Sequence, residues 1–177
     1  PGKKMRDITK RGGIIIAVDP RRTATTKKAT LHVSPLPGSD YAWLAFVIRE
    51  LLADPSGSGV DYKYLNSHGQ GLAELKVATA YFNEERTCQI TGLDAQCLNQ
   101  LVTAIKKTEN LSAVTGTGVS FSDTGIVSEW FLWALLAIKG KLDRSGGVWF
   151  NPGLIKRDLS TFTTSLLPRK TAWSKRM

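Results

Sequence analysis

Residues 12–26, GGIIIAVDPRRTATT, form the stretch from which the fold is predicted. Two glycines lead into an apolar, β-branched run that ends at Val18, a pattern typical of a short, fully buried strand over residues 13–18. The run stops at Asp19, Pro20 and two arginines. Open α/β sheets bind ligands outside the carboxyl ends of their strands. The polar residues after Val18 are therefore a candidate binding site.

The rest of the chain alternates short apolar runs with stretches of helical periodicity. Two more strands are predicted over residues 29–36 and 111–115. Helices are predicted over residues 3–11, 41–54, 60–66, 71–82, 84–91, 94–108 and 124–138. Strands that alternate with helices indicate an α/β fold with a parallel sheet flanked by helices. Three or four strands are few for a doubly wound domain, so we expect an incomplete sheet.

Capping residues mark several of the predicted helix ends. Ser39 or Asp40 is expected to cap the long helix that follows it, and Asn83 to cap a later one that ends at Gly92. Asp94 opens the next helix, which ends in lysines as the helix dipole prefers. The last predicted helix is apolar nearly all round, so we expect it to be buried between layers.

Composition bounds the class of protein. The chain has 177 residues, 42% of them hydrophobic, which is enough for one globular domain with its own core. A formal net charge of +9 would suit a polyanion such as nucleic acid. However, the charge is concentrated in residues 3–11 and 156–176, where solvated tails explain it as well, and basic and aromatic residues do not interleave as in strands that bind RNA. Nucleic acid is therefore not the expected partner.

Neither a secretory signal nor a membrane span is expected. Residues 1–13 are basic and polar, and the longest apolar run, residues 130–138, is about half of what a bilayer requires. The compartment of the protein stays open.

The cysteines predict no special chemistry. Cys88 and Cys97 are too far apart for CxxC chemistry and too few for a disulfide framework. With His32 and His68 they form no cluster at metal-ligand spacing. We expect two small buried or half-buried thiols on helices. The chain also has no GxSxG or HExxH motif, and its carboxylates show no convincing pairing, so no catalytic residue is assigned.

Asp19 and the arginines after it are the first candidate ligand contacts. A carboxylate at a strand end can accept hydrogen bonds from ribose hydroxyls or from a purine edge, and Arg21 or Arg22 can pair with phosphate. The alternative is that Asp19 only caps a turn and that both arginines face water.

Two glycine-containing turns supply further candidates. After Pro37 and Gly38, the Asp40 carboxylate matches the paired N–H donors of guanine, although it can equally cap a helix. Residues 116–118, Gly-Thr-Gly, lie between a predicted strand and a helix, where backbone amides can approach a phosphate or a planar ring. They lack the third glycine of the dinucleotide fingerprint, so a plain tight turn remains the alternative.

Five stretches taken in order resemble one family. They read IAVDPRRTATT, LPGSDYAWL, ERTCQITGLDAQ, TGTGVSFSDTG and WALLAIKGKLDRSGGVWFNPG. They resemble the catalytic subunits of molybdopterin oxidoreductases, the group that contains dimethyl sulfoxide reductases, formate dehydrogenases and nitrate reductases. The resemblance covers residues 11–153. Each motif alone is unspecific, but five motifs in the same order are specific to the family.

The resemblance implies a Rossmann-like domain that binds one of two molybdopterin guanine dinucleotides. Asp19 and Arg21 would contact ribose or guanine and phosphate, and Asp40 would bind guanine. Residues 116–121 would lie nearer the pterin; many relatives carry glutamine where this chain has Phe121, which departs from the family pattern. The expected cofactor-binding residues are Asp19, Arg21, Pro37, Gly38, Asp40, Gly116, Thr117, Gly118 and Ser120.

The resemblance also implies parts that this chain lacks. Iron–sulfur ligands, a molybdenum ligand and the first strand and helix of the Rossmann-like domain are expected elsewhere in a larger subunit. We therefore expect residues 1–153 to be a cofactor-binding domain fragment without turnover of its own, and residues 154–177 to be a basic arm or tail.

The expected partners are the other domains of that subunit, an iron–sulfur electron-transfer subunit and, through the apolar surface near residues 130–138, a second copy of the chain. The alternative is a separate nucleotide-binding or interaction module without catalysis.

Overall fold

The sheet consists of two parallel strands, β1 (Ile16–Val18) and β2 (Leu31–Val33), in the computed structural model, which describes residues 2–149. Ile16 lies opposite Leu31 and Val18 opposite Val33. A short 3-10 helix, η1 (Thr26–Lys28), lies in the connection between the strands. The α/β class with a parallel sheet flanked by helices is confirmed.

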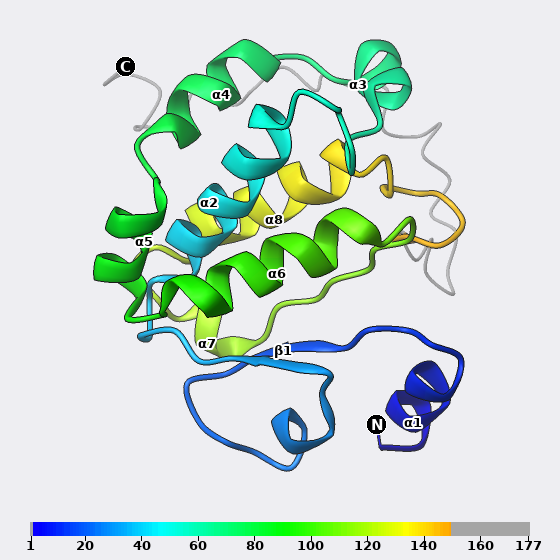
Figure 1. The fold of residues 1–177 in the computed structure, drawn as a ribbon, viewed down its shortest axis with the longest axis vertical. Coiled ribbons are helices and arrows are strands. Elements are labelled where there is room, and N and C mark those ends of the chain that lie inside the picture. The colour runs from blue at the N-terminus through cyan, green and yellow to red at the C-terminus, as the bar shows by residue number, and fades with distance from the viewer. Residues whose placement is uncertain (1, 150–177) are drawn as a thin grey trace, which may run out of the picture.

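The helices that follow the sheet in sequence form a layer on one side of it, and α1 and η1 lie on the other side (Figure 1). Their bounds are α1 (Gly2–Lys10), α2 (Asp40–Ala53), α3 (Tyr62–His68), α4 (Leu72–Ala80), α5 (Glu84–Thr91), α6 (Ala95–Lys107), α7 (Thr117–Ser120) and α8 (Gly125–Ile138). The expected arm over residues 154–177 and the domain boundary at residue 153 lie outside the described residues. No helix in residues 2–149 is long and apolar enough to cross a membrane.

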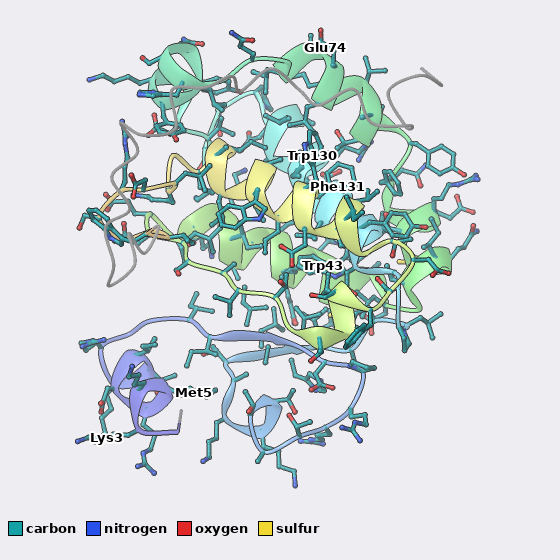
Figure 2. All side chains as sticks on the ribbon, turned by 180° about the vertical axis from the view of Figure 1, so that it is seen from behind. Lys3, Met5, Trp43, Glu74, Trp130 and Phe131 are labelled. Carbon is teal, nitrogen blue, oxygen red and sulfur yellow. The ribbon has the colours of Figure 1, made fainter. Side chains whose placement is uncertain are left out.

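Helix α2 is the centre of the core. It packs against α4, α5, α6 and α8, and its residues are buried on almost every side from Ala42 to Ile48. Trp43 and Phe131 of α8 point into this interior (Figure 2). Burial of an aliphatic or aromatic side chain contributes about 1.5–3 kcal/mol each. The fold of this region therefore depends on α2 more than on the sheet.

The helix ends predicted at Asn83, Gly92 and Asp94 are confirmed. The Asn83 side chain accepts a hydrogen bond from the Arg86 amide at 2.9 Å, and the Asp94 side chain accepts one from the Cys97 amide at 2.6 Å. Gly92 ends α5 in the left-handed conformation at φ +70°.

The cap expected before α2 is wrong. Ser39 occupies the N-cap position but its hydroxyl donates backward to the Leu36 carbonyl at 2.6 Å, so its side chain caps no helix amide. Asp40 is the first helical residue of α2.

The first predicted strand is shorter and less buried than expected. Only Ile16–Val18 pairs, Ile14 is 41% exposed and Val18 is 37% exposed. No partner pairs with the other edge of β1 within residues 2–149, so the two-stranded sheet leaves these side chains half covered.

The predicted strand over residues 111–115 does not form. The segment alternates half-buried and exposed residues as a strand would, but it has no strand partner in the described chain. A cavity of about 340 Å³ separates it from β1, with Ile16 and Val18 on one side and residues 111–116 on the other. Strand formation needs a hydrogen-bonded neighbour.

Helix α8 is not buried all round as predicted. Its inner face is buried at Phe131, Leu132, Leu135 and Leu136, but Ile126 is 88% exposed and Trp130 is 55% exposed. Helix α2, the main packing partner of α8, lies on the opposite side, so these side chains stay exposed in the described part of the chain.

Candidate functional site

Three turns lie at one edge of the fold, each following an extended segment. Residues 19–22 follow β1, residues 34–40 follow β2, and residues 116–120 follow the extended segment at 111–115 (Figure 1). The parallel pairing of β1 and β2 puts their carboxyl ends at the same edge, which is where open α/β sheets bind ligands.

The turn after β1 is held by its own aspartate. Asp19 Oδ1 accepts a hydrogen bond from the Arg21 amide at 2.8 Å, and the Asp19 carbonyl lies 2.8 Å from His32 Nε2. Ser34 Oγ donates to the Pro20 carbonyl at 3.0 Å. Asp19 therefore does cap a turn, and Arg21 is exposed without a carboxylate partner among residues 2–149.

The turn before α2 presents Asp40. Gly38 takes the left-handed conformation at φ +81°, which glycine adopts without strain. Asp40 is half-buried in the first turn of α2, where the helix dipole stabilises its negative charge. Asp40 Oδ1 accepts a hydrogen bond from Trp43 Nε1 at 3.3 Å. This contact orients the carboxylate and leaves acceptor capacity on Oδ2.

The Gly-Thr-Gly turn is open. Gly116 is the N-cap of α7 with φ −126°, and a Cβ added at Gly116 or Gly118 would meet no heavy atom within 4 Å. Neither the backbone conformation of Gly116 nor the packing of residues 2–149 requires glycine there. A ligand that closely approaches the backbone would require it.

The structure brings two of the three turns together. Thr124 Oγ1 donates a hydrogen bond to the Gly38 carbonyl at 2.7 Å. A hollow of about 490 Å³ lies over this contact, lined by Pro37, Gly38, Gly118 and residues 121–124. Asp40 and Gly116 line the neighbouring cavity of about 340 Å³ beside β1.

Other expected site residues stay apart from these hollows. Asp19, Arg21, Thr117 and Ser120 line neither of them. Ser120 is exposed, and its hydroxyl reaches back to the Gly116 carbonyl at 3.4 Å. Phe121, which departs from the family pattern, is 85% exposed at the edge of the larger hollow.

Two positioning side chains were missed by the sequence analysis. The first is Thr124, described above. The second is Glu129, which accepts a hydrogen bond from the Thr115 hydroxyl and so fixes the start of the Gly-Thr-Gly turn on α8. A signal was available for Glu129, because it is the one charged residue in the sequence GIVSEWFLWALLAI of α8.

The cysteines are free and half-buried, as expected, with Cys88 on α5 and Cys97 on α6. Burial raises the pKa of both thiols, which keeps them protonated and unreactive at neutral pH. Residues 2–149 contain no group of three or more His, Cys, Asp or Glu side chains that could hold a metal ion.

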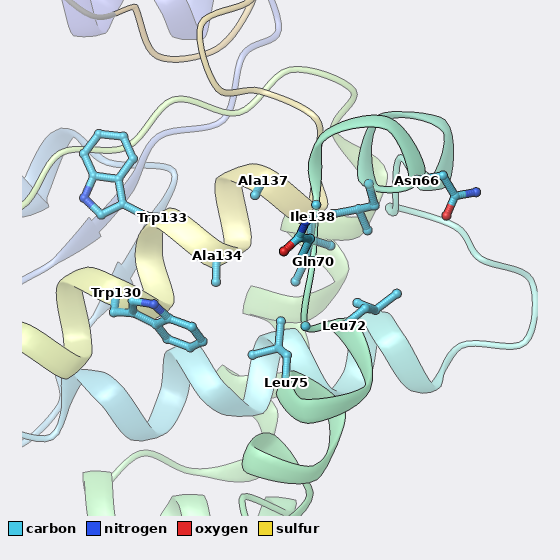
Figure 3. Close-up of a pocket in the computed structure, with 12 residues that line it drawn as sticks. Asn66, Gln70, Leu72, Leu75, Trp130, Trp133, Ala134, Ala137 and Ile138 are labelled. Carbon is cyan, nitrogen blue, oxygen red and sulfur yellow. The ribbon is translucent and has the colours of Figure 1, made fainter. Parts of the chain in front are cut away.

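Another hollow, of about 480 Å³, lies away from the three turns (Figure 3). Trp130 and Ala134 of α8 form one wall, and Leu72 and Leu75 of α4 form the other. Its lining is mainly apolar and contains no charged side chain. It therefore resembles a packing surface more than a site for an anionic ligand.

Curated proteins similar to this chain include subunits of formate dehydrogenases and nitrate reductases. No family model matches the chain. The chain is 27% identical over 135 residues to the alpha subunit of a formate dehydrogenase of Methanococcus maripaludis, covering 76% of this chain and 20% of that protein. It is 27% identical to the assimilatory nitrate reductase catalytic subunit of Bacillus subtilis, covering 75% of this chain and 18% of that protein.

The fold has a solved counterpart. Acetylene hydratase from Pelobacter acetylenicus superposes with a TM-score of 0.72 at 21% identity, covering 78% of this chain and 19% of that one. At this identity the likeness establishes the fold. The chain spans about a fifth of the length of the proteins it matches.

Proposed function

This chain is related to the catalytic subunits of molybdopterin oxidoreductases, and we propose that it is the part of such a subunit that binds the guanosine end of a molybdopterin guanine dinucleotide. The main support for the proposal is that Asp40 and Gly116, the first residue of the open Gly-Thr-Gly turn, line the same cavity. A carboxylate can accept both N–H donors of guanine, and an open glycine backbone lets a phosphate or a planar ring approach closely.

Asp40 is the proposed guanine contact. Guanine presents two adjacent N–H donors, N1 and N2, which match the two oxygens of a carboxylate. The hydrogen bond from Trp43 Nε1 holds one oxygen in place, and the carboxylate lies in the first turn of α2. An ionised acceptor strengthens each hydrogen bond to about twice that of a neutral one.

Gly116 and Gly118 are the proposed points of close backbone approach. Both lie at the start of α7, and a Cβ added at either would meet nothing within 4 Å, so a phosphate or a flat ring could approach the backbone there. Thr117 and Ser120 add hydroxyls to the same turn, and both are exposed. Pro37 and Gly38 complete this surface on the other side of the hollow.

Asp19 and Arg21 are proposed to contact the ribose and the phosphates. The Asp19 turn shapes the backbone so that Arg21 projects without an ion-pair partner among residues 2–149, and a guanidinium binds phosphate with two parallel hydrogen bonds. Neither residue lines the two hollows, so this contact would occur along the strand ends, outside both cavities.

The proposed contacts concern binding and orientation. When bound, such a cofactor supplies two-electron redox chemistry through its metal, and the protein positions it. Because this chain would hold the guanosine end, turnover is proposed to need the other domains of the subunit. An iron–sulfur protein that exchanges electrons with that subunit is the proposed further partner.

Calorimetric titration of the full chain with GDP, GMP and AMP tests the proposal. We expect weak binding of both guanine nucleotides and none of AMP at the same concentration. Asp40→Asn keeps an oxygen for Trp43 but loses the charge, so we expect it to lower GDP affinity about tenfold or more. Asp7→Asn, on the exposed face of α1, is the matched control and should leave the affinity unchanged.

Two results would contradict the proposal. One is equal binding of adenine and guanine nucleotides. The other is strongly salt-dependent binding to DNA or RNA without base preference, which would instead favour a general polyanion surface.

A further inference from the structure

A single side chain joins the two turns over the larger hollow. Thr124 Oγ1 donates to the Gly38 carbonyl at 2.7 Å, across 86 residues of sequence. Most side-chain hydrogen bonds in residues 2–149 join residues within one or two helical turns of each other, as those of Ser39 and Asp61 do. The bond from Thr124 to Gly38 joins residues that are much further apart in the sequence. Local structure therefore does not explain it.

Thr124 is itself held firmly. Its carbonyl accepts hydrogen bonds from the Ser128 amide at 2.9 Å and from Ser128 Oγ at 3.0 Å, which start α8. The Ser122 hydroxyl lies 3.3 Å from Thr124 Oγ1. Because α8 packs along α2, Thr124 is placed by the core of the fold.

Gly38 belongs to a turn that is anchored at Leu36, whose amide donates to the Thr91 carbonyl at 2.8 Å, and at Asp40, where α2 begins. Gly38 takes the left-handed conformation at φ +81°, and an added Cβ would meet only Ser122 Cβ, at 3.8 Å. The amide of Ser39, the next residue, bonds within the turn to the Leu36 carbonyl at 3.1 Å. The hydrogen bond from Thr124 is thus the described contact that ties this turn to the loop of residues 116–124.

We propose that Thr124 is a positioning residue that holds the turn at residues 37–40 against the loop at residues 116–124, so that both act as one nucleotide-binding surface. This inference rests on the proposed function and adds to it the device that assembles the site. Thr124 acts through Gly38 and need not touch the ligand. The Thr124 side chain does not cap α8, so its replacement removes the link between the turns without removing a helix cap.

The test compares three variants of the full chain. Thr124→Val keeps the shape of the side chain and removes the donor, whereas Thr124→Ser keeps the donor. Thr108→Val is the matched control, because it removes a similar hydrogen bond, from Thr108 Oγ1 to the Ile105 carbonyl at 3.0 Å, at the far end of α6.

The first readout needs no ligand. We expect amide hydrogen exchange at Ser39 to become several-fold faster in Thr124→Val, to return to the original rate in Thr124→Ser and to be unchanged in Thr108→Val. If exchange at Ser39 stays the same in Thr124→Val, the proposed link is wrong, whatever the chain binds.

The second readout is GDP affinity. Loss of one neutral hydrogen bond that preorganises a site weakens binding by about fivefold. We expect this loss in Thr124→Val and its recovery in Thr124→Ser. If the unaltered chain does not bind GDP, the proposed function fails while the exchange result still decides the role of Thr124. If it binds and Thr124→Val binds equally well, the positioning role is overturned.

Discussion

Lys139 Nζ donates a hydrogen bond to the Thr108 carbonyl at 2.7 Å and thereby joins the end of α8 to the end of α6. A second hydrogen bond runs from the same ammonium group to the Ile105 carbonyl at 3.1 Å. Lys139 is only 6% exposed, and burial lowers the pKa of its ammonium group. The buried ammonium group supplies a donor to carbonyls at the end of α6, of which the Ile105 carbonyl also accepts from Thr108 Oγ1 at 3.0 Å.

Lys139→Met is therefore expected to destabilise the fold. Methionine keeps the apolar stem but removes both hydrogen bonds of the ammonium group and leaves the Thr108 carbonyl without this donor, at a cost of about 1–3 kcal/mol. Lys141→Met is the control, since Lys141 Nζ bonds the exposed Asn110 side chain at 3.0 Å and should contribute less than about 0.5 kcal/mol. Urea unfolding measures both free energies, and equal losses in the two variants would contradict this account.

Asp54 is expected to make stability depend on acid pH. Its hydrogen bond with Lys106, followed by those from the amide and hydroxyl of Ser56, lowers its pKa to about 2. Because the folded pKa lies below the unfolded value of 3.8, the stabilisation is present above about pH 4 and disappears as pH falls through about 2.

Asp54→Asn should consequently flatten the melting temperature between pH 4 and pH 2 and lower it at pH 6. Melting curves across this range provide the measurement. Asp7→Asn, on exposed α1, should leave the slope as it is in the unaltered chain. An unchanged slope in Asp54→Asn would show that other carboxylates account for the acid sensitivity.

The outer face of α8 is expected to cause self-association. Ile126 and Trp130 are exposed on it beside the apolar hollow of about 480 Å³, and contiguous apolar surface of this kind favours contact with another molecule. Light scattering over a wide range of concentration should show a mass that rises with concentration. The double change Ile126→Ser and Trp130→Gln should abolish the rise, whereas Val77→Ser, at an exposed valine on α4 that does not line this hollow, should not.

The sequence was sufficient to predict those features that depend on residues close together in the chain. Asn83, Gly92 and Asp94 act within one turn of their own helices, so their roles could be read from the order of residues. The class of fold and the turns after β1 and β2 were predicted for the same reason. Whether those turns bind a nucleotide stays a prediction.

The errors concern contacts between distant parts of the chain. Residues 111–115 have the pattern of a strand, but pairing depends on a neighbour that the pattern does not specify. The exposure of α8 depends likewise on what covers its outer face. Thr124 could not be found from sequence, because its partner Gly38 lies 86 residues away and threonine before a helix ordinarily suggests a cap.

Gly116 and Gly125 should respond to alanine in opposite ways. At Gly116 a Cβ would meet nothing and φ is −126°, so Gly116→Ala should leave the melting temperature unchanged or raise it slightly. At Gly125 a Cβ would collide with the Val119 carbonyl, so Gly125→Ala should destabilise the fold by about 1–3 kcal/mol.

Gly116→Ala should also test the proposed contact with the nucleotide. If a nucleotide approaches the Gly116 backbone closely, Gly116→Ala should weaken GDP binding about tenfold in a chain that is as stable as the original. Melting curves measure the stability of each variant, and calorimetric titration of the same samples measures its affinity for GDP. Unchanged affinity in Gly116→Ala would mean that the open turn does not contact the nucleotide.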